Sequence, residues 1–130
     1  MAKLTDKQIG LLKGKNFGNI AVIRPDGTPH LTPVWVDWDG EHVVVNLDQT
    51  RKKLDYIRRD PRVSVEVFNA ENPYEYVSVT GSADLATEGA NDHIRELGRR
   101  YRGEDFEYPL GPDDQRVLVR VKPERVIASR

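Results

Sequence analysis

The sequence predicts a mainly β fold, a small antiparallel β-barrel whose ends are covered by short helices. Two observations favour it. β-rich runs recur along most of the chain, and turn signals such as Pro25-Asp26-Gly27 and Asp39-Gly40 separate them. A chain of 130 residues is long enough for one hydrophobic core but not for two, so we expect a single domain spanning residues 1–130.

Segments rich in β-branched and aromatic residues are expected to form the strands. They are residues 19–24, 31–38, 42–47, 62–68, 74–85 and 116–128. The short turns between the first three predict a tight antiparallel meander. Pro33 lies in the second segment, and proline removes a backbone donor. That strand is therefore expected at a sheet edge, at a bulge or beside a ligand.

Three short helices are expected between these strands. Thr5 and Gln8 have the spacing of a capping box, which predicts a leading helix. A second helix is expected to begin at Thr50 as its N-cap and to end before Pro61. Residues 89–102 have apolar residues at helical spacing, which predicts the third helix.

Charge and composition exclude several functional classes. Twenty Lys+Arg against 21 Asp+Glu give a formal net charge of −1, which argues against general nucleic-acid binding. The chain has no cysteine, so disulfides, thiolate nucleophiles and cysteine metal sites are excluded. The first 15 residues contain no long apolar run. We therefore expect neither a signal peptide nor a membrane span, and a soluble cytoplasmic protein.

The sequence also lacks the motifs of common catalytic and metal sites. His30, His42 and His93 lie far apart and in no spacing typical of metal ligands, so no metal site is expected. Asp39-Gly40 is interpreted first as a turn. No GxGxxG, Walker or nucleophile-elbow pattern occurs, so no catalytic residue is assigned.

One feature that leaves a functional interpretation open is a pair of tryptophans. Trp35 and Trp38 bracket the end of the strand that contains Pro33. Either one of them packs in the core, or they line a pocket for a planar ligand.

The other open feature is the start of the second helix, whose first turn is Arg51, Lys52 and Lys53. The amino end of a helix carries partial positive charge, and each cation there costs about 0.3–1 kcal/mol at low salt. These residues form either a solvated basic turn, or an anion site in which N–H groups, the Thr50 hydroxyl and the cations bind a phosphate.

The order of the segments resembles the pyridoxamine 5′-phosphate-oxidase-like split β-barrel superfamily, from about residue 17 to residue 127. The most specific segment is "TRKKLDYIRRDPRVSV", and "RGEDFEY" with "VKPERV" supports it. Within the superfamily the chain is most similar to the branch that uses the deazaflavin coenzyme F-420, the flavin/deazaflavin oxidoreductases of type B. The resemblance implies an FMN-binding-like antiparallel split barrel with short flanking helices.

The resemblance also implies a cofactor site. A phosphate lies at the start of the short helix, the tricyclic ring lies against a strand, and one aromatic residue reaches the cofactor from a second subunit. The implied residues are Lys53 with Lys52, Arg51 and Thr50 for the phosphate, Thr32, Pro33, Val34 and Asn46 near the ring, and Tyr76 from the second subunit.

The implied activity is hydride transfer from reduced F-420 to an electron-poor acceptor such as an enone, a quinone or a bilin-like tetrapyrrole. A homodimer with cofactor sites between subunits is expected. Pyridoxamine phosphate oxidation is not, because the chain lacks the carboxyl-terminal stretch that such an oxidase uses.

Two rivals stay open: an FMN-binding oxidoreductase of the same fold, and a non-catalytic protein that binds flavin, deazaflavin or haem. Extra cations near the groove favour the deazaflavin, whose phosphate continues into an oligoglutamate tail. The candidates are Arg58, Arg59, Arg99, Arg100 and Arg102.

Overall fold

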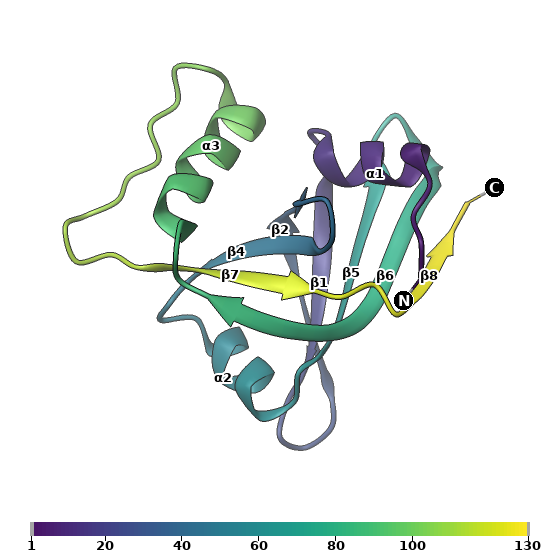
Figure 1. Ribbon diagram of the computed structural model, residues 1–130, viewed down its shortest axis with the longest axis horizontal. Helices are drawn as coiled ribbons and strands as arrows, with labels where there is room; N and C mark the ends of the chain where they lie inside the picture. The colour runs from purple at the N-terminus through teal and green to yellow at the C-terminus, as the bar shows by residue number, and fades with distance from the viewer. Residues whose placement is uncertain (1, 130) are drawn as a thin grey trace.

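The computed structural model describes residues 2–129 and contains eight strands and three helices in that range (Figure 1). The helices are α1 (Asp6–Lys13), α2 (Lys52–Arg59) and α3 (Ala90–Arg102). The strands are β1 (Phe17–Ile23), β2 (Pro29–Trp35), β3 (Asp37–Trp38), β4 (Val43–Asp48), β5 (Arg62–Asn69), β6 (Asn72–Ala86), β7 (Arg116–Val121) and β8 (Arg125–Ala128).

The strands form one sheet in the order β2-β1-β5-β6-β7-β4-β3, with β8 paired to β6, and each pair is antiparallel. The 15-residue strand β6 belongs to both halves of the sheet. Figure 1 shows it curving from its place beside β5 to its place beside β7, so that the two halves cross. The mainly antiparallel β fold with short helices that the sequence predicted is confirmed.

Gly81 allows β6 to change partners. Before it, Thr80 pairs with Arg125 of β8, and after it Ala83 pairs with Val121 of β7. The connection between β7 and β8 passes so close that a Cβ on Gly81 would lie 1.6 Å from the carbonyl oxygen of Lys122. Only glycine therefore fits this point of the strand.

Two expectations about the strands need correction. The meander stops after β2, because β2 pairs only with β1 and ends the sheet, whereas β3 pairs with β4. The run 116–128 is two strands rather than one. Pro33 lies in β2, which is an edge strand. An edge was one of the three positions expected for this strand, because proline has no N–H to donate.

One helix boundary was also predicted wrongly. Thr50 is not the N-cap of α2; the N-cap is Arg51, which makes no side-chain capping bond. The Thr50 backbone N–H and hydroxyl both donate to Asp48 Oδ1, at 2.9 and 2.6 Å, and this holds Thr50 in the turn before the helix. The capping box of α1 is as predicted, with Thr5 and Gln8 bonding each other's backbone.

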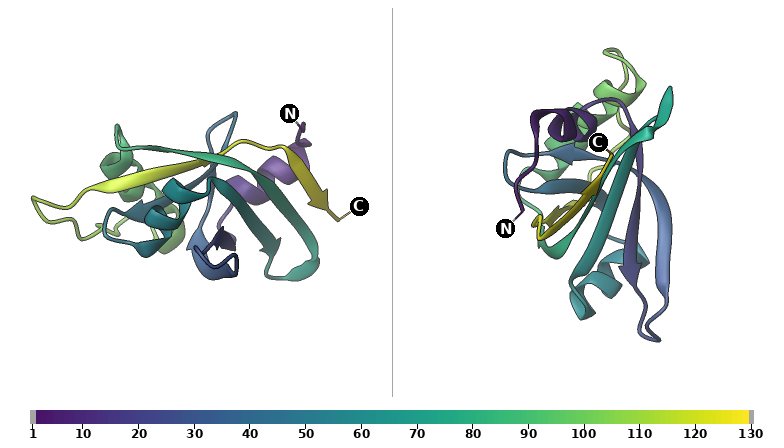
Figure 2. Two further views of the ribbon diagram at one scale, coloured as in Figure 1. Left: turned by 90° about the horizontal axis from the view of Figure 1, so that it is seen from below. Right: turned by 90° about the vertical axis from the view of Figure 1, so that its right-hand side faces the viewer.

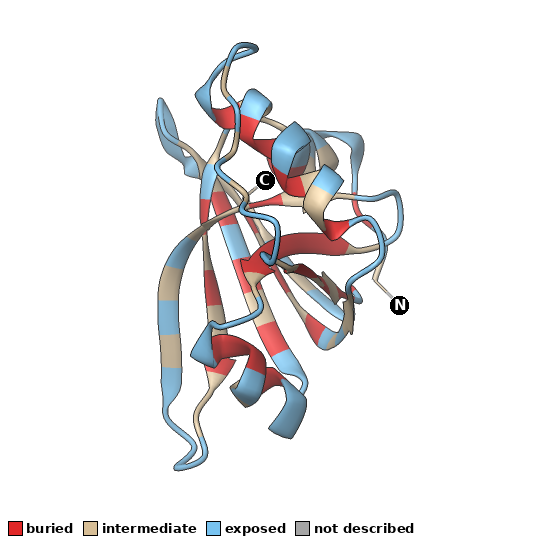
Figure 3. Cartoon of the chain, turned by 90° about the vertical axis from the view of Figure 1, so that its left-hand side faces the viewer, coloured by how far each residue is buried: buried red, intermediate tan, exposed pale blue. Residues whose placement is uncertain are grey.

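The core lies between the two halves of the sheet, and β4 is buried along almost its whole length. Helix α1 contacts β3, β5 and β6, α2 contacts β1, and α3 contacts β4 and β7. Figure 3 shows the buried residues of α2 and α3 on the sides that face the sheet. Within residues 2–129, no helix combines the length and apolar character needed to cross a membrane.

The chain ends lie on the side away from α3. The Ala2 N–H donates to the Pro123 carbonyl at 2.8 Å, so the first residues run beside the connection between β7 and β8 (Figure 2). The long loop from α3 to β7 projects at the opposite end of the molecule.

Candidate functional site

A cleft of about 480 Å³ opens where β2 and β4 meet the first turn of α2, near α3 and β7. Its polar lining is cationic overall, with two arginines and a lysine against one carboxylate. The polar residues are Thr32, Asn46, Asp48, Arg51, Lys53 and Arg116. The apolar and aromatic residues are Phe17, Pro33, Val34, Trp35, Leu47, Ile94 and Tyr108.

Lys53 lies in the first turn of α2 and points inward, because Leu54 and Ile57 on the same helix are buried in the core. It is only 9% exposed, and its Nζ donates to Thr32 Oγ1 at 2.7 Å. Within residues 2–129, no carboxylate oxygen lies within 4.0 Å of Lys53 Nζ, so Lys53 forms no salt bridge with a described residue. Burial, together with the charge of Arg51, lowers the pKa of Lys53.

The first turn of α2 adds backbone donors to this charge. Helix N-termini leave N–H groups without intrahelical partners, and the N-cap residue, Arg51, gives them no side-chain acceptor. Arg51 itself lines the cleft. A buried lysine, an exposed arginine and uncapped N–H groups therefore converge on one end of the cleft, which is an arrangement suited to an anion.

Arg116 and Asn46 form the polar wall at the β4 and β7 side. Arg116 Nε donates to Asn46 Oδ1 at 2.9 Å, and Arg116 Nη2 donates to the Asn46 carbonyl at 3.1 Å. Arg116 Nη1 donates to the Tyr108 hydroxyl at 3.1 Å. Both residues are buried, Asn46 at 7% and Arg116 at 9% exposed. Together with Lys53 they are the buried polar residues of the described chain, and all three face the cleft.

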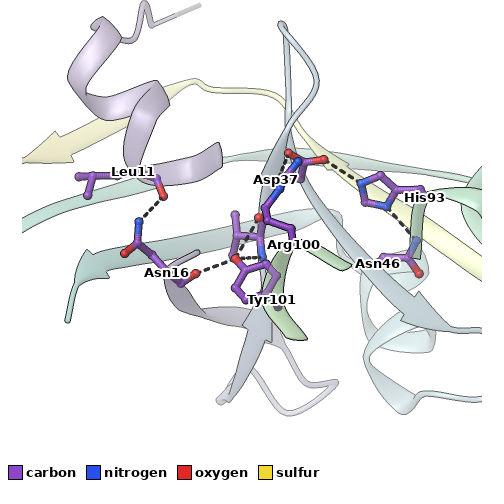
Figure 4. A network of polar contacts seen from close by, with 8 residues as sticks. Leu11, Asn16, Asp37, Asn46, His93, Arg100 and Tyr101 are labelled. Carbon is purple, nitrogen blue, oxygen red and sulfur yellow. Dashed lines mark hydrogen bonds and ion pairs between the residues drawn. The ribbon is translucent and has the colours of Figure 1, made fainter. Parts of the chain in front are cut away.

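The network continues from Asn46 away from the cleft (Figure 4). Asn46 Nδ2 donates to the Ala90 carbonyl at 2.9 Å and lies 3.0 Å from His93 Nδ1. His93 Nε2 lies 2.9 Å from Asp37 Oδ2, and Arg100 Nη1 donates to Asp37 Oδ1 at 2.8 Å. Burial acts to raise the pKa of Asp37, but the hydrogen bonds from His93 and Arg100 outweigh it and lower the pKa to about 2.

Of the two tryptophans, one lines the cleft and the other packs against the core. Trp35 lines the cleft and stacks on Tyr101 with ring centroids 5.1 Å apart and planes within 5°. The Tyr101 hydroxyl donates to the Asn16 carbonyl at 2.7 Å and accepts from the Val36 N–H at 3.1 Å, which fixes the ring (Figure 4). Trp38 packs against the core instead.

The sequence matches the family model described as pyridoxamine 5′-phosphate oxidase over residues 4–130. The chain belongs to this family. An F-420 reductase of known structure is similar to it, with 31% sequence identity, a TM-score of 0.82, and coverage of 95% of this chain and 98% of that chain.

Two other solved structures share the family's fold. A conserved hypothetical protein from Mycobacterium tuberculosis is 27% identical, with a TM-score of 0.72, and the match covers 95% of this chain and 83% of that one. General Stress Protein 26 from Bacillus anthracis is 21% identical, also with a TM-score of 0.72, covering 93% and 89%.

The structure brings most of the residues implied by the family resemblance into the cleft. Six of them line it: Thr32, Pro33, Val34, Asn46, Arg51 and Lys53. Three do not. Lys52 is exposed and lies outside the lining, and Thr50 bonds Asp48 in the preceding turn. Tyr76 borders a separate hollow on β6 with Glu66, Phe68 and Pro73.

Sequence reasoning missed several cleft residues and proposed others that lie elsewhere. Arg116, Tyr108 and Asp48 were not expected to line the cleft, whereas none of the five arginines proposed as extra cations lines it. Arg100, for example, is bound to Asp37. Strand alternation gave no signal for Arg116, because the buried apolar residues of β7 are Val117, Val119 and Val121, and Arg116 lies on the opposite face with Leu118 and Arg120.

The histidines take part in hydrogen bonds rather than in a metal cluster. His42 Nδ1 lies 3.0 Å from Asp39 Oδ2, and His30 Nδ1 lies 3.0 Å from Arg24 Nη2. No group of three or more His, Cys, Asp or Glu side chains that could hold a metal ion occurs among residues 2–129.

Proposed function

We propose that the cleft binds the deazaflavin coenzyme F-420 and that the protein is an oxidoreductase that reduces a small electron-poor organic acceptor. The observation that carries the proposal is Lys53, a lysine 9% exposed, without a carboxylate partner among the described residues, beside the uncapped start of α2. The similarity to an F-420 reductase at 31% identity over nearly the full length supports the choice of cofactor.

The cleft residues fit a phosphate-bearing ring cofactor. A buried cation is costly unless an anion pairs with it, so Lys53 with Arg51 and the α2 N–H groups would hold the phosphate. The edge strand β2 has a strand partner on one side only. Thr32 and Val34 pair with Ile20 and Gly18 of β1, so the backbone carbonyl of Pro33, on the open side, is a candidate to contact the ring. Lys52 adjoins the phosphate position in the family pattern, and Thr50 was proposed for its hydroxyl at the helix start, but in one chain both lie outside the cleft lining.

We also propose a homodimer. In the family pattern Tyr76 reaches the cofactor of the other subunit, and this requires two copies of the chain. The strand register places Phe17, Leu31, Ile127 and Tyr76 on the outer face of the sheet formed by β2, β1, β5, β6 and β8. Phe17, Leu31 and Ile127 are 56, 66 and 57% exposed, so this face offers apolar surface to a second copy. A mass near 14.8 kDa by light scattering would contradict the dimer.

When bound, reduced F-420 supplies a hydride for an electron-poor acceptor such as an enone, a quinone or a bilin-like tetrapyrrole. The protein's share of the chemistry is to bind, orient and exclude water. Trp35, fixed by its stacking on Tyr101, gives the cleft a rigid aromatic wall. Phe17 and Val34 add apolar lining.

The proposal is tested by titrating the purified protein with F-420 and with FMN at one salt concentration and following fluorescence. We expect F-420 to bind more tightly. Tighter FMN binding would assign the protein to the flavin users of the family, and binding of neither would overturn the proposal. Steady-state reduction of model enones and quinones by reduced F-420 then separates an enzyme from a protein that only binds the cofactor.

The phosphate site is tested with Lys53→Ala and a matched control, Lys52→Ala, in which the exposed neighbour is removed. A charge-assisted hydrogen bond contributes about 1.5–3 kcal/mol, so Lys53→Ala should weaken cofactor binding about 10- to 150-fold. Removal of a buried cation at the positive end of α2 should leave the melting temperature of the apoprotein unchanged or slightly higher. Equal affinities for both variants and the wild type would refute the site.

A further inference from the structure

We infer that Arg116 forms a second anion-binding subsite in the cleft, separate from the one at Lys53, and that His93 is a positioning residue that holds it there through Asn46. The subsite binds a carboxylate or a phosphate. Both roles follow from hydrogen bonds within the protein and hold whichever cofactor binds in the cleft.

Arg116 has donors left over for a ligand. A guanidinium has five N–H donors, and three of them bond Asn46 and Tyr108. Arg116 is 9% exposed, and within residues 2–129 no carboxylate lies within 4.0 Å of it. Its cross-strand neighbour Asp48 is attracted by the charge of Arg116 but forms no ion pair with it, and Asp48 Oδ1 accepts from Thr50 instead. A buried guanidinium with free donors and no carboxylate within ion-pair distance is a built site for an anion.

The subsite is distinct from the phosphate site because the two cations share no partner. Lys53 lies on α2 and bonds Thr32 of β2, whereas Arg116 lies on β7 and bonds Asn46 of β4 and Tyr108 of the loop before β7. The planar fork of an arginine suits two-point binding of a carboxylate or phosphate, which a lysine cannot provide.

The orientation of the Asn46 amide follows from two of its neighbours. Arg116 Nε can only donate, so it faces the amide oxygen, and the Ala90 carbonyl can only accept, so it faces the amide nitrogen. The nitrogen therefore also points at His93, 3.0 Å from its Nδ1. Reversing the amide would place donor against donor at Arg116 and acceptor against acceptor at Ala90.

This orientation fixes the state of His93. Because Asn46 Nδ2 donates, His93 Nδ1 must be unprotonated, and the ring proton sits on Nε2, which donates to Asp37 Oδ2 at 2.9 Å. Arg100 holds the other oxygen of Asp37 at 2.8 Å. The chain Arg100, Asp37, His93, Asn46, Arg116 thus has one consistent pattern of donors and acceptors, and it requires a neutral histidine (Figure 4).

Protonation of His93 would disrupt this pattern at Asn46. A proton on Nδ1 faces the amide nitrogen, so the bond to Asn46 is lost, or the amide turns and loses its bonds to Arg116 and Ala90. The charged groups around His93 are Asp37 on β3, Arg100 on α3 and, beyond Asn46, Arg116 on β7. Acid should therefore weaken anion binding at Arg116, although protonating a nearby histidine ordinarily strengthens it.

The test uses the full chain without cofactor and inorganic sulfate as the probe, because sulfate does not change charge between about pH 5 and 8, where histidine titrates. The Nε–H resonance of Arg116 is followed by nitrogen-15 NMR, since this group is hydrogen-bonded and local to the subsite. At pH 8 we expect a saturable shift of this resonance in the wild type and also in Lys53→Ala. No shift, or a shift that disappears in Lys53→Ala, would overturn a separate subsite.

The role of His93 is tested by comparing two variants with the wild type. Glutamine has a donor group and an acceptor group and does not ionise, so His93→Gln should keep sulfate affinity within about threefold, whereas His93→Ala should lose about tenfold or more. From pH 8 to pH 5 the affinity at Arg116 should fall in the wild type and stay constant in His93→Gln. If the wild type bound sulfate more strongly in acid, this result alone would overturn the positioning role of His93.

The anion at Arg116 can come from the cofactor or from the acceptor substrate, and a further titration distinguishes them. If saturating F-420 abolishes the sulfate response of Arg116, the anion belongs to the cofactor; if the response persists, it belongs to the acceptor. Since the sulfate measurements need no cofactor, failure of F-420 to bind would refute the proposed function and leave the subsite standing. If sulfate did not bind at Arg116 but F-420 bound normally, the subsite would be refuted and the proposed function would stand.

Discussion

Two hollows of similar size lie on this protein, and their charges are arranged differently. The cleft has a volume of about 480 Å³, and a second hollow of about 410 Å³ is formed by residues of β6, β7 and the turns beside them. The second hollow is lined by Glu41, His42, Ser82, Ala83, Asp84, Arg120, Lys122 and Glu124. In it Arg120 Nε bonds Asp84 Oδ1 at 2.7 Å, and both side chains are substantially exposed.

The comparison shows that volume does not distinguish a binding site from an ordinary surface hollow. In the second hollow Arg120 is paired with Asp84 and both side chains are exposed to water, so a ligand anion would gain little there. In the cleft, Lys53 and Arg116 are buried and have no carboxylate within 4.0 Å among the residues described. The desolvation of these cations is offset only when an anion arrives, and this makes the cleft selective.

The largest effect is expected from giving the cleft an internal carboxylate. In Thr32→Asp a carboxylate replaces the hydroxyl that now lies 2.7 Å from Lys53 Nζ. It would pair the lysine and repel a phosphate, so cofactor affinity by fluorescence titration should fall at least about 100-fold. The melting temperature should not fall, because a buried cation gains a partner.

The control for this variant is Thr32→Asn, which keeps an acceptor of similar size without charge. It should weaken binding less than about tenfold. If Thr32→Asp bound the cofactor as tightly as Thr32→Asn does, the unpaired charge of Lys53 could not be the basis of binding.

A smaller effect, on stability, is expected from Asp37, whose side chain is 15% exposed and whose pKa is lowered to about 2. A carboxyl whose pKa is lower in the folded than in the unfolded chain adds stability at pH values above its unfolded pKa. This stability is lost as the pH falls through the folded pKa. Asp37→Asn should therefore cost about 2 kcal/mol at pH 7.

Urea unfolding at a series of pH values checks this expectation. The difference between wild type and Asp37→Asn should shrink as the pH falls from about 4 toward 2. A difference that does not change with pH would mean that the loss comes from packing rather than from the charge of Asp37.

The smallest effect is expected in the second hollow. Asp84→Asn leaves Arg120 without its carboxylate partner, but exposed ion pairs contribute less than about 1 kcal/mol. Thermal melting should change little, and a sulfate titration should detect no new site near Arg120. A sulfate site created by this one substitution would show that burial of the cation is not needed, and the contrast between the hollows would fail.

Local patterns predicted those parts of the molecule that depend on neighbours in the sequence. The capping box joins Thr5 and Gln8, three positions apart, and Pro33 indicated the edge of the sheet as one of three places for its strand. Thr50 is a residue type that often caps helices, but it does not cap α2. Its N–H and its hydroxyl both donate to the carboxylate of Asp48, two residues earlier, and this local bonding replaces the cap.

The rest of the cleft depends on contacts that sequence reasoning cannot see. Arg116 and Asn46 are 70 positions apart and meet only because β4 and β7 pair. His93 meets Asp37 across 56 positions, from a helix to a two-residue strand. The group Arg51, Lys52 and Lys53 was noticed because three cations at a helix start conflict with the helix dipole, and a local conflict of this kind is visible in the sequence. The choice of Lys53 within the group came from the family resemblance.

The length of β6 has a consequence for how the chain reaches its final state. Residues 77–80 of this strand have β5 on one side and β8 on the other, so their amide hydrogens should exchange with solvent among the slowest in the protein. During synthesis the β5 side can pair early, through a short connection, but β8 emerges almost last. Until then β6 has an open edge, and a nascent chain halted before residue 125 would present it to other chains, where it could start aggregation.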